Sequence, residues 1–336
     1  LDEARPTSGQ NYVSARLYNE DKFSRVKAKY RGDLPVHWGF FKRSLRVKTK
    51  REDLFHGFRT FNLIAPKSPS LYMNHAGYEI ARLLGILAPD SLMVDLNING
   101  HYAGIHLLVE QISETTLRNA RRLPGDIYSG DQRVGLNAWR GIGLHLFEST
   151  GLWEKVASNN HYPPEHIAPL RALLMAIPQQ DTTQLEQIVD LDAFATFNLF
   201  EQITNSTHTD DYHNWRLYYD PGRAKFYPII WDSMAWADDF ILIEGNSYWV
   251  PPAEIKASEL MRSLHRSENF LATKKEIFSR FINNTMPDQI NDTLDRIEKQ
   301  IRPAAYLDRA ILSENYQWSS ADESIERMSI NRKLFE

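Results

Sequence analysis

The 336-residue sequence predicts an α+β fold: an antiparallel sheet carrying one helix in the first half, and a mainly helical second half. Two observations predict this division. Strand-like runs dominate to about residue 110, and apolar residues then recur with the 3.6-residue period of helices. A single predicted hairpin, over residues 215–231, interrupts the helical half. This interruption makes the hairpin a candidate for a functional role.

The composition is ordinary for a globular protein, with 42% hydrophobic and 24% charged residues and a net charge of −4. This balance gives no global positive field that would attract nucleic acid. No cysteine is present, which excludes disulfides and thiolate zinc sites. No apolar run reaches the roughly 20 residues of a membrane-spanning helix. Because the chain begins with Leu1 and lacks cysteine, we expect a processed, exported bacterial protein, although cysteine is nearly as often absent by chance.

The first half contains strong local signals. Residues 70–84 are predicted to form a helix that Ser70 caps and Gly85 ends. Asn99-Gly100 separates two strand-like runs, which is the strongest short-range signal of a hairpin. Strands are expected at residues 25–30, 44–49, 61–64, 92–98 and 102–109.

Helices of the second half are expected at residues 164–177, 182–204, 257–264, 270–283 and 287–312. The interrupting hairpin has strands at residues 215–219 and 225–231, joined by a Pro-Gly turn. A hairpin brings its two ends together, so Asn214 and Asp232 should be near neighbours.

An amide oxygen and a carboxylate at that separation suit magnesium. Asp210 and Asp211 precede Asn214, and either could receive a hydroxyl proton or position an acceptor. Protein kinases build their active site from these parts. The alternative is that the four residues are loop and cap residues.

The same loop contains His208 and His213, which raises the alternative of a zinc or iron site. Their spacing matches no helical zinc signature, and the neighbouring acids and amide suit magnesium better.

A cationic row precedes the predicted helix. Lys42, Ser44, Arg46 and Lys48 alternate, which places them on one face of a strand, where the cations could hold phosphates. A solvated edge strand is an equally good interpretation. Glu110 closes the last strand of the sheet, where a cleft floor or an exposed carboxylate would both fit.

Four stretches, in order, resemble the CotH kinase family, named for a bacterial spore coat protein. The stretches are residues 41–48 (FKRSLRVK), 94–104 (VDLNINGHYAG), 107–112 (LLVEQI), and 213–218 (HNWRLY) followed by 228–232 (PIIWD). Together they span about residues 25–240. The resemblance implies an atypical protein-kinase-like fold, with an N-lobe at 1–112 and a C-lobe at 113–336. It implies ATP, magnesium or manganese, and a protein substrate bearing Ser or Thr.

The resemblance also assigns roles. Asp232 and Asn214 would bind the metal, Lys42 or Lys48 would meet the phosphates, and Glu110 would lie at the nucleotide cleft.

Two positions depart from the family pattern. The family places its loop Asp five residues before the Asn, where this chain has Thr209, so Asp210 or Asp211 would serve instead. The family often has a second Asp two residues after the first, where this chain has Met234. Three alternatives therefore stay open: adenylyl transfer, amino-acid ligation, or a non-catalytic surface or coat module.

Overall fold

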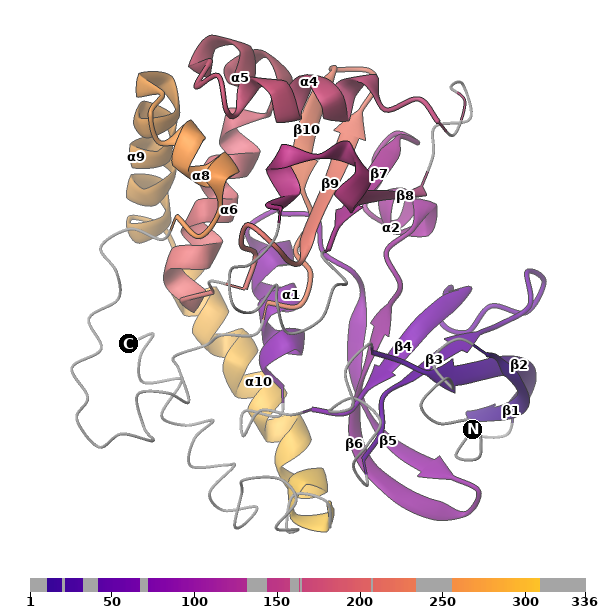
Figure 1. Ribbon diagram of the computed structural model, residues 1–336. Helices are drawn as coiled ribbons and strands as arrows, with labels where there is room; N and C mark the ends of the chain where they lie inside the picture. Colours follow the sequence, from indigo (N-terminus) through magenta and orange to yellow (C-terminus); the bar gives the residue numbers. More distant parts are fainter. Residues whose placement is uncertain are drawn as a thin grey trace.

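The computed structural model describes residues 11–19, 22–32, 42–66, 72–131, 144–157, 163, 165–206, 208–233 and 256–308. Figure 1 shows a twisted sheet formed by the first part of the chain beside a larger body of helices and strands. The mixed α and β composition predicted from the sequence is confirmed in these residues.

The first sheet is antiparallel throughout. Its strands are β1 (Val13–Asn19), β2 (Lys22–Tyr30), β3 (Leu45–Lys48), β4 (Thr60–Ile64), β5 (Ser91–Ile98) and β6 (His101–Glu110). They are arranged in the order β1-β2-β3-β4-β6-β5. One face carries a small core that includes Val47, Phe61 and Leu108. Strand β1 was not expected. Its apolar residues Val13, Ala15 and Leu17 do alternate with polar ones, but the run is short and most of its residues are exposed.

The β5–β6 hairpin confirms the Asn-Gly prediction. Ile98 pairs with His101, which leaves Asn99 and Gly100 as a two-residue turn. Both have positive φ, at 52° and 81°, as a type I′ turn requires.

Helix α1 (Met73–Leu83) connects β4 to β5 and packs against α10 and α6. The predicted helix at 70–84 therefore holds for its described part, since residues 67–71 lie outside the described residues. Gly85 follows the helix with a φ of 79°, a conformation that glycine adopts without steric cost.

The second half contains more strand than the sequence predicted. A four-stranded sheet, ordered β10-β9-β7-β8, joins the expected hairpin of β9 (Trp215–Asp220) and β10 (Lys225–Pro228) to β7 (Asp126–Gly130) and β8 (Trp153–Ala157). The prediction of a mainly helical second half missed β7 and β8. Both have only five residues, and β7 is buried along its whole length, so it shows no polar alternation.

Helices cover this second sheet and continue beyond it (Figure 1). They are α2 (Glu114–Asn119), α4 (Ala168–Ala176), α5 (Thr182–Ile188), α6 (Leu191–Thr204), α8 (Glu259–Leu264), α9 (Glu268–Ile282) and α10 (Met286–Leu307). The predicted helix at 182–204 is two helices, because Asp190 caps α6 and its backbone N–H bonds to Phe226 of β10. Among the described helices, none is both long and apolar enough to cross a membrane.

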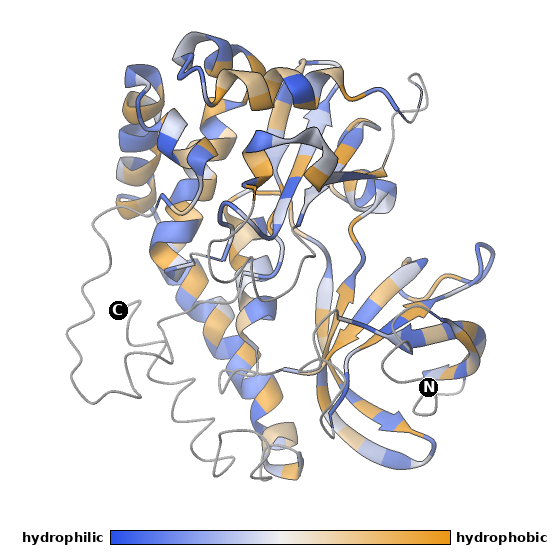
Figure 2. Cartoon of the chain, viewed as in Figure 1, coloured by the Kyte–Doolittle hydropathy of each residue, from blue (hydrophilic) through white to orange (hydrophobic). Residues whose placement is uncertain are grey.

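The long helix α10 links the two parts of the fold. Apolar and polar residues alternate along it (Figure 2), and Ile290, Leu294, Ile297 and Ile301 form its buried face. It packs against α1, and its C-terminal end reaches β6. The C-terminal end of α10, near residue 307, therefore lies against a sheet that the first 110 residues of the chain form.

Candidate functional site

The β9–β10 hairpin places Asn214 and Asp232 where each shares a hydrogen bond with the same residue, His208. The Asn214 Nδ2 donates a hydrogen bond to the His208 carbonyl at 3.0 Å, and the His208 Nδ1 bonds to the Asp232 carbonyl at 2.6 Å. Both Asn214 and Asp232 have positive φ, at 65° and 50°, which Asn and Asp tolerate better than most residues. The two predicted metal ligands thus sit at the same end of the hairpin.

Helix α1 holds Asp232 from its other side. The Asn74 Nδ2 donates to Asp232 Oδ1 at 3.0 Å, and the Asp232 backbone N–H donates to the Tyr78 hydroxyl at 3.1 Å. Between them, Gly77 lets the chain approach, since a Cβ there would lie 2.2 Å from Ser233 Oγ. Burial, with Asp232 nearby, raises the pKa of the Tyr78 hydroxyl, so this contact stays neutral.

The sequence did not predict that Asn74, Gly77 and Tyr78 of α1 would lie against Asp232 and Ser233. The three residues follow the i, i+3, i+4 spacing of one helix face, which was the available signal. These three residues are harder to recognise in the sequence than the apolar face of the helix, because an amide, a glycine and a phenol share no chemical property.

Asp210 is held by its own loop. Its Oδ1 accepts hydrogen bonds from the backbone N–H groups of Tyr212 and His213, each at 2.7 Å, and lies 3.2 Å from His213 Nδ1. Burial raises the pKa of the Asp210 carboxyl, but the bonds from the His213 ring and Tyr212 outweigh it and leave that pKa below its ordinary value. The same contact raises the pKa of His213. Asp210 is therefore an ionised, oriented carboxylate whose side chain remains 35% exposed.

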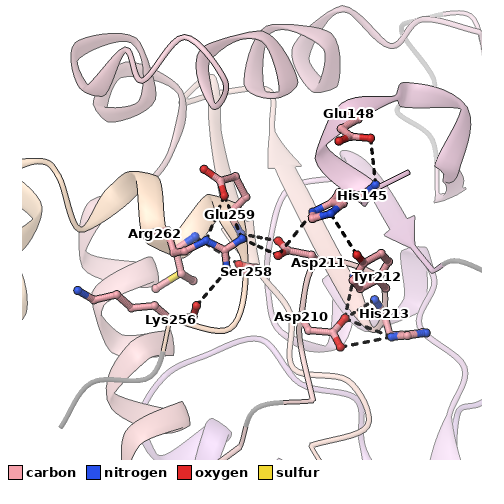
Figure 3. A network of polar contacts seen from close by, with 11 residues as sticks. His145, Glu148, Asp210, Asp211, Tyr212, His213, Lys256, Ser258, Glu259 and Arg262 are labelled. Carbon is pink, nitrogen blue, oxygen red and sulfur yellow. Dashed lines mark hydrogen bonds and ion pairs between the residues drawn. The ribbon is translucent and has the colours of Figure 1, made fainter. Parts of the chain in front are cut away.

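Asp211 points toward a different element (Figure 3). Its Oδ1 accepts from the Glu259 backbone N–H at 2.5 Å, and its Oδ2 pairs with Arg262 at 2.5 Å and lies 3.7 Å from His145 Nδ1. The residue is buried. These contacts attach the loop to the first turn of α8, so Asp211 has the partners of a structural anchor.

Lys42 differs from the expectation. We expected it on the same face as Arg46 and Lys48, but it precedes β3 and is buried in an ion pair with Asp308. Burial lowers the pKa of its ammonium group, and the Asp308 carboxylate opposes that shift. The expectation failed because the alternating geometry of a strand does not extend to residue 42.

Arg46 and Lys48 do share a face of β3. Arg46 pairs with Lys29 and Asn62, and Lys48 pairs with Lys27 on β2. Residues that pair directly in adjacent strands lie on the same face, so these cations form one basic face.

A chain of hydrogen bonds crosses this face. Arg46 Nε donates to Asn62 Oδ1 at 2.9 Å, and Asn62 Nδ2 donates to Gln111 Oε1 at 3.1 Å. Asn62 and Gln111 were not predicted as site residues. Gln111 is instead the neighbour of the residue that was predicted, Glu110.

Glu110 lies on the opposite face from Arg46. It pairs with Phe61, whereas Arg46 pairs with Asn62, and successive residues of a strand alternate in direction. Its buried side chain lines a pocket of about 240 Å³ with Asp90 and Thr116. Burial, and then the charge of Asp90, raises its pKa to about 7. The structure therefore does not bring Glu110 together with the cations of β3.

The donor atoms at the hairpin fit magnesium better than a softer metal. The Asp232 carboxylate and the Asn214 amide oxygen are hard donors, whereas His208 and His213 use Nδ1 in the hydrogen bonds described above. Within the described ranges, no cluster of three or more His, Cys, Asp or Glu side chains could hold a metal by itself. Magnesium in nucleotide sites is typically bound by one or two carboxylates together with phosphates and water, and Asp232 can supply one such carboxylate.

Comparison with known proteins decides the family. A family model described as "CotH kinase protein" matches residues 28–333, which includes the helices beyond the four motifs. The chain belongs to the CotH kinase family. Membership in the CotH kinase family supports a kinase-like function for the chain. No curated protein matches the chain.

One solved structure similar to this CotH kinase family member is from the toxin–antitoxin system of Shewanella oneidensis MR-1, a complex of HipA, HipB and operator DNA. The two chains are 13% identical, with a TM-score of 0.31. The match covers 95% of this chain and 62% of the other, so this chain spans less than two thirds of that one's length.

Proposed function

We propose that this CotH kinase family member transfers the γ-phosphoryl group of ATP to a Ser or Thr hydroxyl of a protein, with magnesium or manganese as cofactor. The observation that carries the proposal is the convergence of Asn214 and Asp232 on His208, with Asp210 in the same loop. A carboxylate, an amide and a separate loop carboxylate are the parts that kinase chemistry uses.

In this proposal, separate protein groups bind the metal and activate the acceptor hydroxyl. The Asp232 carboxylate and the Asn214 amide oxygen hold the metal, whose chemistry when bound is to neutralise charge on the phosphates. Asp210 orients the acceptor hydroxyl and takes its proton as the hydroxyl oxygen bonds to the γ-phosphorus. The bond from that phosphorus to the leaving ADP breaks, and His213 keeps Asp210 ionised beforehand.

The nucleotide phosphates are assigned to the basic face of the first sheet. Within this face, Asn62 fixes the Arg46 guanidinium and Gln111 fixes Asn62. A guanidinium held by a neighbour loses less entropy when it binds an anion.

The test is intact-mass measurement after incubation with ATP, magnesium and a generic protein acceptor. The proposal expects the added mass of one phosphate on the acceptor, and its loss in Asp232→Asn, which keeps the shape of the side chain but removes its charge. Added AMP or an added amino acid would point to adenylyl transfer or ligation. No added mass from folded protein would favour the non-catalytic module.

A further inference from the structure

The side chain of Asn74 has an oxygen without a hydrogen-bond partner. The residue is 9% exposed, and its Oδ1 is buried without a partner in the part of the chain that the structure describes. A buried polar atom left unsatisfied costs about 1–3 kcal/mol, so such atoms are uncommon without a reason. The other end of the same amide touches the Asp232 carboxylate, the proposed metal ligand.

A second unsatisfied oxygen lies close by. Ser233 Oγ is buried and has no hydrogen-bond partner among the described residues, and it is pressed against Gly77, one turn along α1 from Asn74. The α1 side of Asp232 therefore holds two oxygens whose capacity to accept is unused. A cation is one partner that uses acceptor oxygens only.

The spacing fits a metal ion. Asn74 Nδ2 and Asp232 Oδ1 are 3.0 Å apart. An amide can turn over within its own outline, which exchanges its nitrogen for its oxygen. Two oxygens bound at 2.0–2.1 Å on neighbouring corners of a magnesium octahedron are separated by about 2.9 Å. The Asn74 amide and the Asp232 carboxylate are therefore close enough for an oxygen of each to bind one ion.

We propose that Asn74 is a direct ligand of the divalent cation at Asp232, through its side-chain oxygen. The Asn74 amide and the Asp232 carboxylate would then hold the ion together. This inference rests on the proposed function, because the cation is the one used with ATP.

The experiment measures Mn²⁺ affinity by electron paramagnetic resonance, without nucleotide, so that it does not depend on turnover. Asn74→Leu removes the oxygen, and we expect Mn²⁺ affinity to fall by about tenfold or more. Asn74→Asp replaces the amide with a charged oxygen donor, and we expect affinity equal to or tighter than that of the unaltered protein. Asn97→Asp, on an exposed part of β5, adds the same charge elsewhere and should change nothing.

The Asp variant separates a ligand from a positioning residue. If Asn74 only donated a hydrogen bond to Asp232, a carboxylate there would repel Asp232, and Asn74→Asp would bind Mn²⁺ more weakly than Asn74→Leu. That order of affinities, or unchanged affinity in Asn74→Leu, would overturn the inference. Circular dichroism of each variant confirms that the fold is kept.

The two proposals fail differently. Mn²⁺ affinities in the expected order, without phosphate transfer in the mass assay, would keep Asn74 as a ligand and remove the kinase reaction. Phosphate transfer by a protein whose Asn74→Asp variant binds Mn²⁺ weakly would keep the reaction and remove the ligand.

Discussion

Lys42 and Asp308 form a buried ion pair between residues 266 positions apart in the sequence. The same Asp308 carboxylate accepts the backbone N–H of Ile105 at 2.8 Å. Gly104 is what allows this approach, since a Cβ there would lie 2.4 Å from the carboxylate oxygens. The carboxylate therefore joins the end of α10 to both the segment that precedes β3 and the middle of β6.

The first prediction concerns this pair. Lys42→Met leaves the Asp308 carboxylate buried without its counter-charge, so we expect a loss of about 3–5 kcal/mol in the free energy of unfolding. The double variant Lys42→Met with Asp308→Leu should lose less than the sum of the two single changes, because both charges are removed together. Urea unfolding of the four proteins measures this coupling.

The opposite pattern would restore the original expectation for Lys42. If Lys42→Met kept full stability and instead weakened ATP binding, Lys42 would be a phosphate ligand and its pairing with Asp308 incidental.

The second prediction separates Asp210 from Asp211. Asp210→Asn should lower turnover by about 10²-fold or more, with a smaller loss of stability than Asp211→Asn, since it removes the proposed proton acceptor from a partly exposed site. Asp211→Asn should instead lower stability by about 1–3 kcal/mol, because it weakens the bonds to Arg262 and to α8. Single-turnover kinetics and thermal unfolding of both variants provide the two measurements. Unimpaired turnover in Asp210→Asn together with inactive, stable Asp211→Asn would exchange the two roles.

The third prediction concerns the basic face. Arg46→Met should weaken ATP–magnesium binding by about tenfold or more, since a charge-assisted hydrogen bond is worth about 1.5–3 kcal/mol. Arg25→Met is the matched control, because this exposed arginine lies on β2 away from the Asn62–Gln111 chain. Isothermal titration calorimetry compares the two. Equal losses in both variants would mean that the face acts only through its total charge.

The fourth prediction is a pH dependence at Glu110. Its pKa is raised from 4.5 to about 7, so the folded state favours the protonated form. The stability that this provides is fully present below pH 4.5 and is lost as the pH rises through about 7. Glu110→Gln does not titrate, so its advantage in unfolding free energy over the unaltered protein should grow across that interval, to roughly 1–3 kcal/mol.

Glu114→Gln is the control for this titration, since Glu114 is an exposed residue of α2 paired with Arg118. The same measurement on Glu114→Gln shows how much of any change comes from removing a surface carboxylate. A flat profile for Glu110→Gln would mean that Glu110 ionises at an ordinary pH in the folded state.

Features fixed by neighbouring residues could be predicted from the sequence. Asn99-Gly100 determines its hairpin through backbone preference, and the turn at Asp220 determines the hairpin that brings Asn214 to the end occupied by Asp232. Both rest on a few consecutive residues, so no knowledge of the remaining fold was needed. The strand at 44–49 was found for the same reason, and β3 begins one residue later.

Features fixed by distant residues could not be predicted. The bond from Asn74 to Asp232 spans 158 positions, and no local pattern reveals which helix a hairpin end will meet. Lys42 was predicted to contact phosphates, because no local sequence pattern indicates that Asp308, 266 positions away, is its partner. The direction of Asp211 depends equally on α8, which begins at Glu259.

The attachment of Asp308 to the first sheet has a consequence during synthesis on the ribosome. Chains grow at about 5–20 residues per second, so the 266 positions from Lys42 to Asp308 take roughly 13–53 s to make. Throughout that interval Lys42 lacks the Asp308 carboxylate, and the surface of β6 that contacts α10 remains uncovered. The first sheet therefore cannot be completed as an independent unit while translation proceeds. A nascent chain stalled before residue 308 should stay sensitive to protease in β6, whereas one stalled well beyond it should be protected.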